Sequence, residues 1–262
     1  MKSTISKAVR LATLGLTAAG AMAVSQTTMA DVDVSASAGV ASAYLFRGVD
    51  LGDGNAAVFG DITASAGGAY ASVWASSGDA ELGSEYDLIL GYGMEMGDFS
   101  VDAGVVNYLY PSDDASDSIG DFSEVYLNIG FGAVGFSYSD NVAGGNGYEY
   151  YALSAEHGSF SAVLGYADIQ DKAEFLGEKA DADYTHLDIT YAYNDNLSFT
   201  ISKVVDFDDD LDANNSGNLE AAATAADVAT GGGSTAAADQ FSDLTFIDDD
   251  LLFVVSYSLP IK

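Results

Sequence analysis

The sequence of 262 residues contains no cysteine, only two histidines and only two prolines. Without cysteine there is no disulfide framework, no thiolate metal site and no cysteine nucleophile. Two histidines are too few for a histidine-rich metal site. Cations are also scarce, with 8 Lys and Arg against 40 Asp and Glu and a formal charge of −32. Binding to nucleic acid is therefore excluded on electrostatic grounds, since it depends on Lys and Arg displacing counterions from phosphate.

The N-terminus has the three parts of a secretory signal peptide. Lys2, Lys7 and Arg10 supply the positive region, residues 11–24 form an apolar run, and residues 28–30 (Thr-Met-Ala) carry small residues where a signal peptidase cleaves. We predict cleavage after residue 30. The alternative is an uncleaved membrane anchor, but this run is short for a membrane span.

The mature chain is predicted to be exported and extremely acidic. Removing residues 1–30 leaves five cations against 40 acids, a formal charge of −35. Apolar residues make up 48% and aromatic residues 11% of the sequence, which is enough to form a folded domain rather than a disordered chain. The five remaining cations are Arg47, Lys172, Lys179, Lys203 and Lys262.

Apolar and polar residues alternate along the mature chain with a period of two, which is typical of β-strands. No mature segment offers the ~20 consecutive apolar residues of a membrane helix. About twelve strand-like stretches can be counted: 32–48, 57–66, 69–77, 84–95, 99–110, 121–131, 134–140, 148–156, 160–168, 183–193, 197–205 and 250–259.

Short and long connections alternate between these stretches. Two or three residues separate the pairs that meet at residues 67–68, 96–98, 132–133, 157–159 and 194–196, whereas the intervening connections are longer. This alternation is typical of an outer-membrane β-barrel, which has tight periplasmic turns and long outer loops. Such a sheet must be closed, because lipid offers no hydrogen-bond partner to a free strand edge.

We therefore predict an all-β fold: an antiparallel transmembrane outer-membrane β-barrel of about 12 strands, with short periplasmic turns and long acidic outer loops. Residues 31–262 form its single domain, and residues 206–249 form one long acidic, low-complexity outer loop. The alternative is a soluble secreted β-sandwich or jelly roll, which alternates in polarity but need not alternate its connections. Aromatic residues near strand ends are expected in the interfacial girdles: Tyr44, Phe46, Tyr108, Tyr110, Tyr150 and Tyr151.

Within each predicted strand, the polar residues that alternate with the apolar ones are the candidate lining of a pore. Carboxylates along a narrow aqueous path concentrate cations and repel anions. Arg47 is the only arginine of the mature chain, and we expect it to pair with interior acids such as Asp61 or Asp87. The alternative is a satisfied polar plug without a continuous path. The candidate lining and selectivity residues are Arg47, Asp61, Glu85, Asp87, Asp102, Glu124 and Asp188.

Several short segments in residues 42–126 resemble the TorF family of porin-like proteobacterial outer-membrane proteins. The resemblance implies a barrel that passes small solutes, and it implies no particular substrate. Beyond Phe131 it fades to a general barrel pattern. The segments are 42–48 (SAYLFRG), 70–76 (YASVWAS), 85–87 (EYD) with 91–92 (GY), 102–104 (DAG) with 108–111 (YLYP), and 124–126 (EVY).

A dedicated metal site is not expected. An EF-hand loop beginning at Asp210 would need glycine at 215 and glutamate at 221, where the chain has Asn215 and Ala221. Loose binding of divalent cations at Asp208, Asp210 and Asp212 is the weaker alternative.

Catalysis is not expected either. Residues 157–159 (His-Gly-Ser) have the His-x-Ser spacing of lipid A deacylases, but they fall in a predicted periplasmic turn. His186 beside Asp188 is interpreted as polar lining.

The sequence thus predicts a channel for passive, cation-preferring diffusion of small hydrophilic solutes. The alternatives are a non-conducting structural or surface-interaction barrel and, less favoured, an outer-membrane lipid hydrolase. No cofactor is expected. The expected partners are outer-membrane lipid and lipopolysaccharide, the barrel assembly machinery, and small solutes or cations.

Overall fold

The computed structural model describes residues 32–113, 116–144, 148–169, 174–175, 178–179, 183–207 and 250–261. The predicted signal peptide (1–30) and nearly all of the predicted acidic loop (206–249) lie outside these residues, apart from the end of β15 at Phe207.

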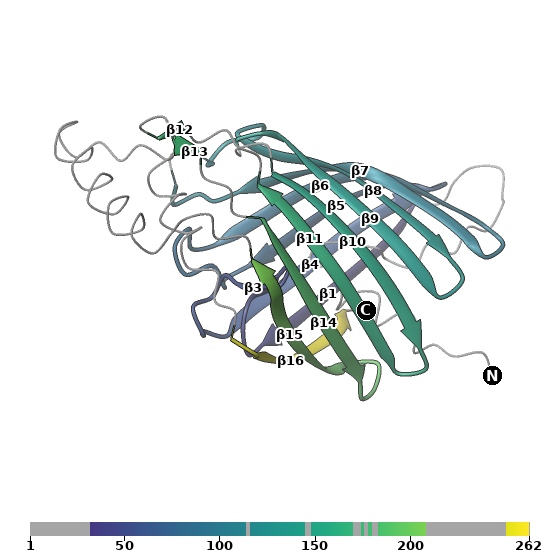
Figure 1. Ribbon diagram of the computed structural model, residues 1–262. Helices are drawn as coiled ribbons and strands as arrows, with labels where there is room; N and C mark the ends of the chain where they lie inside the picture. The colour runs from purple at the N-terminus through teal and green to yellow at the C-terminus, as the bar shows by residue number, and fades with distance from the viewer. Residues whose placement is uncertain are drawn as a thin grey trace.

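Twelve strands close into one antiparallel barrel, in the order β1-β16-β15-β14-β11-β10-β9-β8-β7-β6-β5-β4 (Figure 1). The barrel predicted from the sequence is therefore confirmed, and the β-sandwich is wrong. The strands are β1 (Asp33–Ala41), β4 (Ala57–Ala66), β5 (Ala69–Ser76), β6 (Glu85–Met96), β7 (Phe99–Leu109), β8 (Phe122–Phe131), β9 (Val134–Ala143), β10 (Tyr148–His157), β11 (Phe160–Ile169), β14 (Tyr184–Ala192), β15 (Leu197–Phe207) and β16 (Leu252–Ile261).

The period-two pattern separates the two faces of this barrel. On β6, Tyr86, Leu90 and Tyr92 are exposed, whereas Glu85 and Asp87 are buried. Successive side chains of a strand point to opposite faces, so the apolar set lies outside and the acidic set inside. The same division gives the barrel many exposed large apolar residues on its outer surface, including Val34, Val58, Ile62, Val73, Val125, Leu153, Leu164, Ile189, Ile201 and Phe253.

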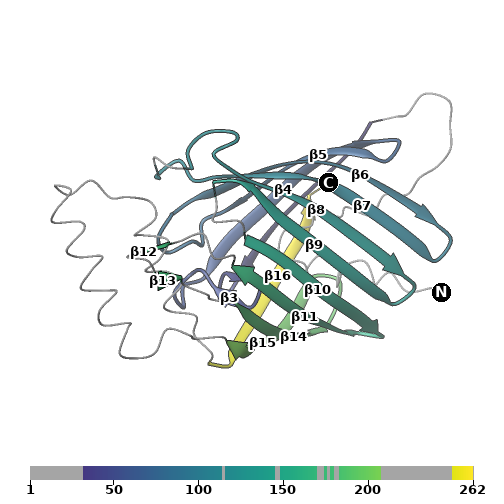
Figure 2. The ribbon, with the colours of Figure 1, turned by 45° about the horizontal axis from the view of Figure 1, so that its top comes forward.

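The connections also divide between the two ends of the barrel. Turns at 67–68, 97–98, 132–133, 158–159 and 193–196 lie at the end where β1 begins and β16 finishes. Four of them use a glycine with positive φ, which a residue with Cβ adopts less readily: Gly67, Gly97, Gly132 and Gly158. The opposite end carries the longer connections and two small hairpins, β2–β3 (Leu45–Phe46 and Val49–Asp50) and β12–β13 (Glu174–Phe175 and Glu178–Lys179) (Figure 2).

One predicted strand is wrong in a way that matters for function. Residues 32–48 were expected to form a single strand, but β1 ends at Ala41 and the chain leaves the barrel wall. Residues 45–50 then form the β2–β3 hairpin, with Leu45 paired to Asp50 and Phe46 to Val49.

None of the described residues belongs to a helix long and apolar enough to cross a membrane.

Candidate functional site

The β2–β3 hairpin folds into the interior of the barrel. Its tip turns at Arg47 and Gly48, which have φ angles of 48° and 87°. A side chain at Gly48 would collide with the ring of His186 on β14, so the tip lies directly against the barrel wall. Asp50 fixes the return of the chain by accepting hydrogen bonds from the amides of Gly52 and Gly54, both at 2.9 Å.

Arg47 anchors the hairpin to β8. Its Nη1 and Nη2 donate to the two carboxylate oxygens of Glu124, at 3.1 and 2.6 Å. Both side chains are almost fully buried, with 7% and 3% exposed. A buried, two-pronged pair of this kind holds both position and orientation. Arg47 therefore pairs with an interior acid, as expected, but the partner is Glu124 rather than Asp61 or Asp87, because the inward fold of the hairpin carries Arg47 to β8.

Aromatic rings complete the surroundings of Arg47. The guanidinium carbon lies 4.7 Å from the ring centre of Phe46, 5.1 Å from that of Tyr148 and 4.6 Å from that of Tyr150, which are cation–π distances. The hydroxyl of Tyr184 donates to the backbone carbonyl of Arg47 at 3.1 Å. The only arginine of the mature chain is thus enclosed on several sides and is not a mobile surface charge.

Glu85 and Asp87 form an acidic pair at the loop end of β6. Glu85 accepts a hydrogen bond from the hydroxyl of Tyr44. Asp87 is completely buried, and neither of its oxygens has a hydrogen-bond partner among the described residues. The charged groups that act on it are Glu85 and Glu124, both acids. Burial and the neighbouring acids disfavour a negative charge on Asp87, so this pair does not by itself attract cations.

Two tyrosines beside this pair belong to the connections rather than to the barrel strands. The pKa of the Tyr44 hydroxyl lies well above its ordinary value, first because of burial and then because of the charge on Glu85. The same two causes, in the same order, raise the pKa of Tyr110. Both tyrosines therefore remain protonated donors beside Glu85.

A chain of polar contacts crosses the interior on β10, β14 and β15. Nε2 of His186 lies 2.8 Å from the hydroxyl of Tyr150, and its Nδ1 lies 3.1 Å from Asp188. Ser202 donates to the same oxygen of Asp188 at 2.6 Å. His186 and Ser202 are fully buried. The His186–Asp188 pair is thus packed among interior polar groups, as the sequence interpretation placed it.

Asp61 and Asp102 lie near the middle of β4 and β7 and are more accessible. Asp61 accepts a hydrogen bond from Ser37. Asp102 accepts hydrogen bonds from Tyr70 at 2.9 Å and from Asn128 at 3.3 Å. All seven candidate lining residues therefore lie inside the barrel, though Asp61 and Asp102 do not join the cluster around Arg47. Their role in selectivity stays a prediction.

The predicted aromatic girdle is largely wrong. Tyr44, Tyr108, Tyr110 and Tyr150 are buried inside the barrel, where they pack against or hydrogen-bond the interior charges. Tyr151 does point outward, with its ring centre 5.1 Å from that of Tyr138 and 6.4 Å from that of Tyr166. The alternation along β7 already indicated an inward position for Tyr108, because Tyr108 and Asp102 lie on the same face of that strand.

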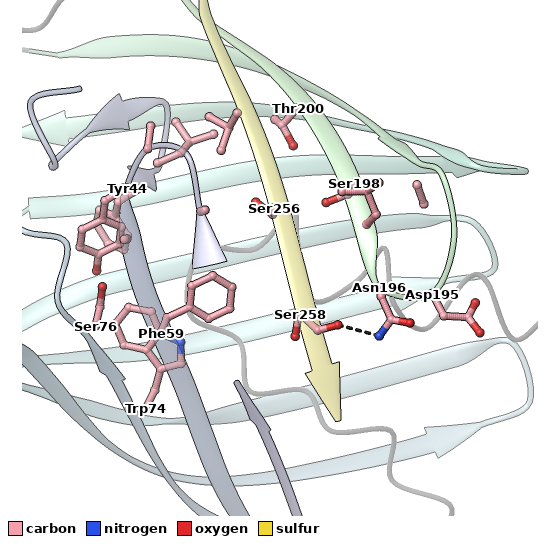
Figure 3. A pocket seen from close by; sticks show the side chains of 18 of the residues that line it. Tyr44, Phe59, Trp74, Ser76, Asp195, Asn196, Ser198, Thr200, Ser256 and Ser258 are labelled. Carbon is pink, nitrogen blue, oxygen red and sulfur yellow. Dashed lines mark hydrogen bonds between the residues drawn. The ribbon is translucent and has the colours of Figure 1, made fainter. Parts of the chain in front are cut away.

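A cavity of about 210 Å³ lies inside the barrel, between the β2–β3 hairpin and the turn at 193–196 (Figure 3). Residues of β4 and β5 line one side of it and residues of β15 and β16 line the other. This cavity was not anticipated from the sequence, because its aromatic and hydroxyl side chains come from strands at opposite ends of the chain.

The other sequence candidates are placed as follows. His157 is the last residue of β10 and is exposed. Gly158 and Ser159 follow it in a turn, at the end of the barrel that carries the tight turns. Asp208, Asp210 and Asp212 lie outside the described residues. Within the part of the chain that the structure describes, no group of three or more His, Asp or Glu side chains could hold a metal ion.

Comparison with known proteins gives a family and a set of distant barrels. The model of a family described as "Bacterial protein of unknown function (Gcw_chp)" matches residues 25–230. This description does not carry the name of the TorF family, which residues 42–126 resemble, so that resemblance stays a prediction. No curated protein matches.

Among solved structures, OccAB4 of Acinetobacter baumannii matches at 10% identity and a TM-score of 0.37, over 79% of this chain and 54% of that one. This chain thus spans about half the length of OccAB4. Two structures of the outer membrane protein OprD from Pseudomonas aeruginosa match at 13% and 15% identity, with TM-scores of 0.36 and 0.37. They cover 90% and 94% of this chain and 67% and 73% of OprD. The closed barrel itself is established by the strand pairing of this chain.

Proposed function

We propose a function for this chain from the premise that it belongs to the Gcw_chp family of bacterial proteins, whose description assigns none. It is an outer-membrane, porin-like channel for passive diffusion of small hydrophilic solutes, with a preference for cations. The observation that carries the proposal is a closed barrel with an apolar outside and an acidic inside.

The outer surface supports a location in lipid. Leu90 and Ile62, in the middle of their strands, are 60% and 61% exposed. Large apolar patches are rare on soluble monomers, whereas a transmembrane barrel needs an apolar band on every strand. Closure of the sheet pairs the backbone of every strand, as a membrane interior demands. The tight turns, the start of β1 and the end of β16 then face the periplasm.

The interior supports a preference for cations. Asp61, Asp102 and Asp188 point inside, and among the described side chains Arg47 is the only Lys or Arg that does so. Arg47 is already neutralised by Glu124, so the remaining carboxylates set the sign of the field. Acidic groups in a low-dielectric enclosure raise the local concentration of cations and repel anions.

The β2–β3 hairpin supports a narrow path. It occupies the interior beneath the longer connections, and its tip contacts His186 and Glu124 on two different strands. A solute must therefore pass beside the hairpin or wait for it to move. We propose that the channel is constricted at Arg47, with low conductance and strong discrimination by size.

One observation favours a second function. The interior around Arg47 and His186 is almost fully buried and extensively hydrogen-bonded, as in a barrel filled by its own side chains. In that case the barrel is a non-conducting structural protein and its outer connections contact the partners. Planar-bilayer recording distinguishes the two. Discrete steps with a cation-selective reversal potential support the channel, and silence from protein shown to be folded supports the filled barrel.

A further inference from the structure

The cavity inside the barrel has two chemically different walls (Figure 3). One wall presents the aromatic rings of Tyr44, Phe59 and Trp74. The other presents a set of hydroxyl groups on β15 and β16. The residues of this hydroxyl wall are Ser198, Thr200, Ser256 and Ser258.

The aromatic wall is a packed platform. The ring centres of Phe59 and Trp74 lie 6.5 Å apart with 20° between their planes, and those of Tyr44 and Trp74 lie 6.0 Å apart with 34°. The ring of Phe59 covers Gly39, where a Cβ would lie 2.5 Å from its Cζ. Because Gly39 has no side chain, the platform extends across β1 toward β16. It offers a solute a nearly continuous apolar face.

The hydroxyl wall is held in register by the barrel. Ser198 and Ser256 are directly paired partners on β15 and β16. Beside the turn at 193–196, the side-chain amide of Asn196 donates to the backbone carbonyl of Ser258 at 2.6 Å. The backbone carbonyl of Asn196 accepts a hydrogen bond from the backbone amide of Ser258 at 2.9 Å. The backbone that carries these hydroxyls is therefore fixed, and the hydroxyls border the cavity on the other side of β1 from the rings.

Charge is nearly absent from this lining, in contrast to the acidic interior around Asp87. Asp195 is the one charged residue among the lining residues, and it is exposed in the turn between β14 and β15. A charged solute would lose its hydration here without gaining a partner. A neutral solute with many hydroxyl groups keeps its hydrogen bonds on one wall and packs its C–H face against the other.

We infer that this cavity binds a neutral polyhydroxylated ring compound, of the monosaccharide class. Its volume of about 210 Å³ exceeds the roughly 150 Å³ of a protein cavity that holds one benzene ring, so it has room for a single six-membered ring. The inference deepens the proposed channel function and rests on it for the route of entry. Binding itself does not require conduction, so the two can be tested separately.

The protein carries its own reporter, because Trp74 is its only tryptophan. The protein is expressed as the full chain, purified in detergent and shown by circular dichroism to be folded. D-glucose is then titrated while the emission of Trp74 is recorded. We expect a saturable change in emission. Cyclohexanol has a similar ring but a single hydroxyl, and it should give a weaker response over the same concentrations.

Three variants locate the site. Ser256→Ala removes one hydroxyl from the wall and should weaken glucose binding about fivefold, the usual effect of one lost hydrogen bond. Ser137→Ala makes the same chemical change on the inner face of β9, outside the cavity, and should leave binding unchanged. Phe59→Leu removes an aromatic ring of the platform, on β4, and should also weaken glucose binding. This variant still tests the site if Ser256→Ala does not fold.

The inference is overturned by an emission change that is linear in glucose, by cyclohexanol binding as tightly as glucose, or by equal affinities in all three variants. Saturable glucose binding by a barrel that is silent in bilayers would contradict the channel and leave the site intact. Conductance without glucose binding would contradict the site and leave the channel intact.

Discussion

Arg47 and Glu124 are 77 residues apart in the chain, yet a paired hydrogen bond joins them across the interior of the barrel. This pair fixes the β2–β3 hairpin to β8. The Arg47–Glu124 pair therefore holds in place a segment of the interior that does not belong to the wall.

Breaking the pair from one side should be costly. Glu124→Gln leaves a buried guanidinium without its counterion, and we expect the free energy of unfolding to fall by about 3 kcal/mol. The double variant Arg47→Met with Glu124→Met removes both charges and should recover most of that loss. Urea unfolding of all variants measures the coupling. Losses that simply add would show that the two side chains do not depend on each other.

Neutralising an accessible interior acid should change ion selectivity. Asp61→Asn removes a partly exposed carboxylate near the middle of β4, and we expect the ratio of cation to anion permeability to fall severalfold. The reversal potential under a salt gradient measures this ratio. Asp140→Asn, on the outer face of β9, makes the same change of net charge and should leave the ratio unaltered. An Asp61 variant with wild-type selectivity would show that this residue does not set the preference for cations.

The apolar outside can be tested at two depths on one strand. Leu90 and Met96 both point outward from β6, with 60% and 61% of each side chain exposed. In a bilayer, Leu90→Lys near mid-strand should lower the free energy of unfolding by about 2–4 kcal/mol, whereas Met96→Lys at the strand end should cost less than about 1 kcal/mol. Folding into lipid vesicles at increasing urea measures both. Two small, equal effects would point to a barrel whose outside faces water.

Much of the fold could be predicted because a barrel strand carries its own signal. On β6 the alternation of Tyr86, Leu88 and Leu90 with Glu85 and Asp87 gave both the strand and its lipid face. Glycines in the tight turns located the strand ends to within about two residues. These signals are local, so they can be read without knowing what the strand pairs with.

The interior was less predictable because its contacts are not local. Period-two alternation continued past Ala41 into residues 42–48, and nothing in that pattern shows that the chain leaves the wall there. The partner of Arg47 depends on where the hairpin points, which only the closed barrel decides. The cavity beside Trp74 likewise needs closure of the barrel to bring β4 and β5 close to β15 and β16, which lie more than 100 residues further along the chain.

Asp79 should make the stability of the long connection between β5 and β6 depend on pH. Burial raises the pKa of its carboxyl above the ordinary value of 3.8, and hydrogen bonds from the amides of Leu82 and Glu81 only partly oppose this. A raised pKa in the folded state means that Asp79 contributes stability below pH 3.8 and loses it as the pH rises.

Asp79→Asn keeps an oxygen that can accept those hydrogen bonds and removes the titration. Relative to the wild type, the variant should therefore gain stability between pH 3.5 and 7, in urea unfolding measured at several pH values. Asp98→Asn, exposed in the turn between β6 and β7, corrects for the change in net charge. A difference between Asp79→Asn and wild type that stays constant with pH would contradict the buried carboxyl.

The measurement that tests the central claim most directly is the conductance and reversal potential of the purified protein in a planar bilayer under a salt gradient. The account predicts small discrete steps with a reversal potential that favours cations, and larger steps when Glu124→Gln releases the hairpin. Folded protein that gives no steps, in the wild type and in the Glu124 variant alike, would contradict a channel and leave a barrel filled by its own hairpin.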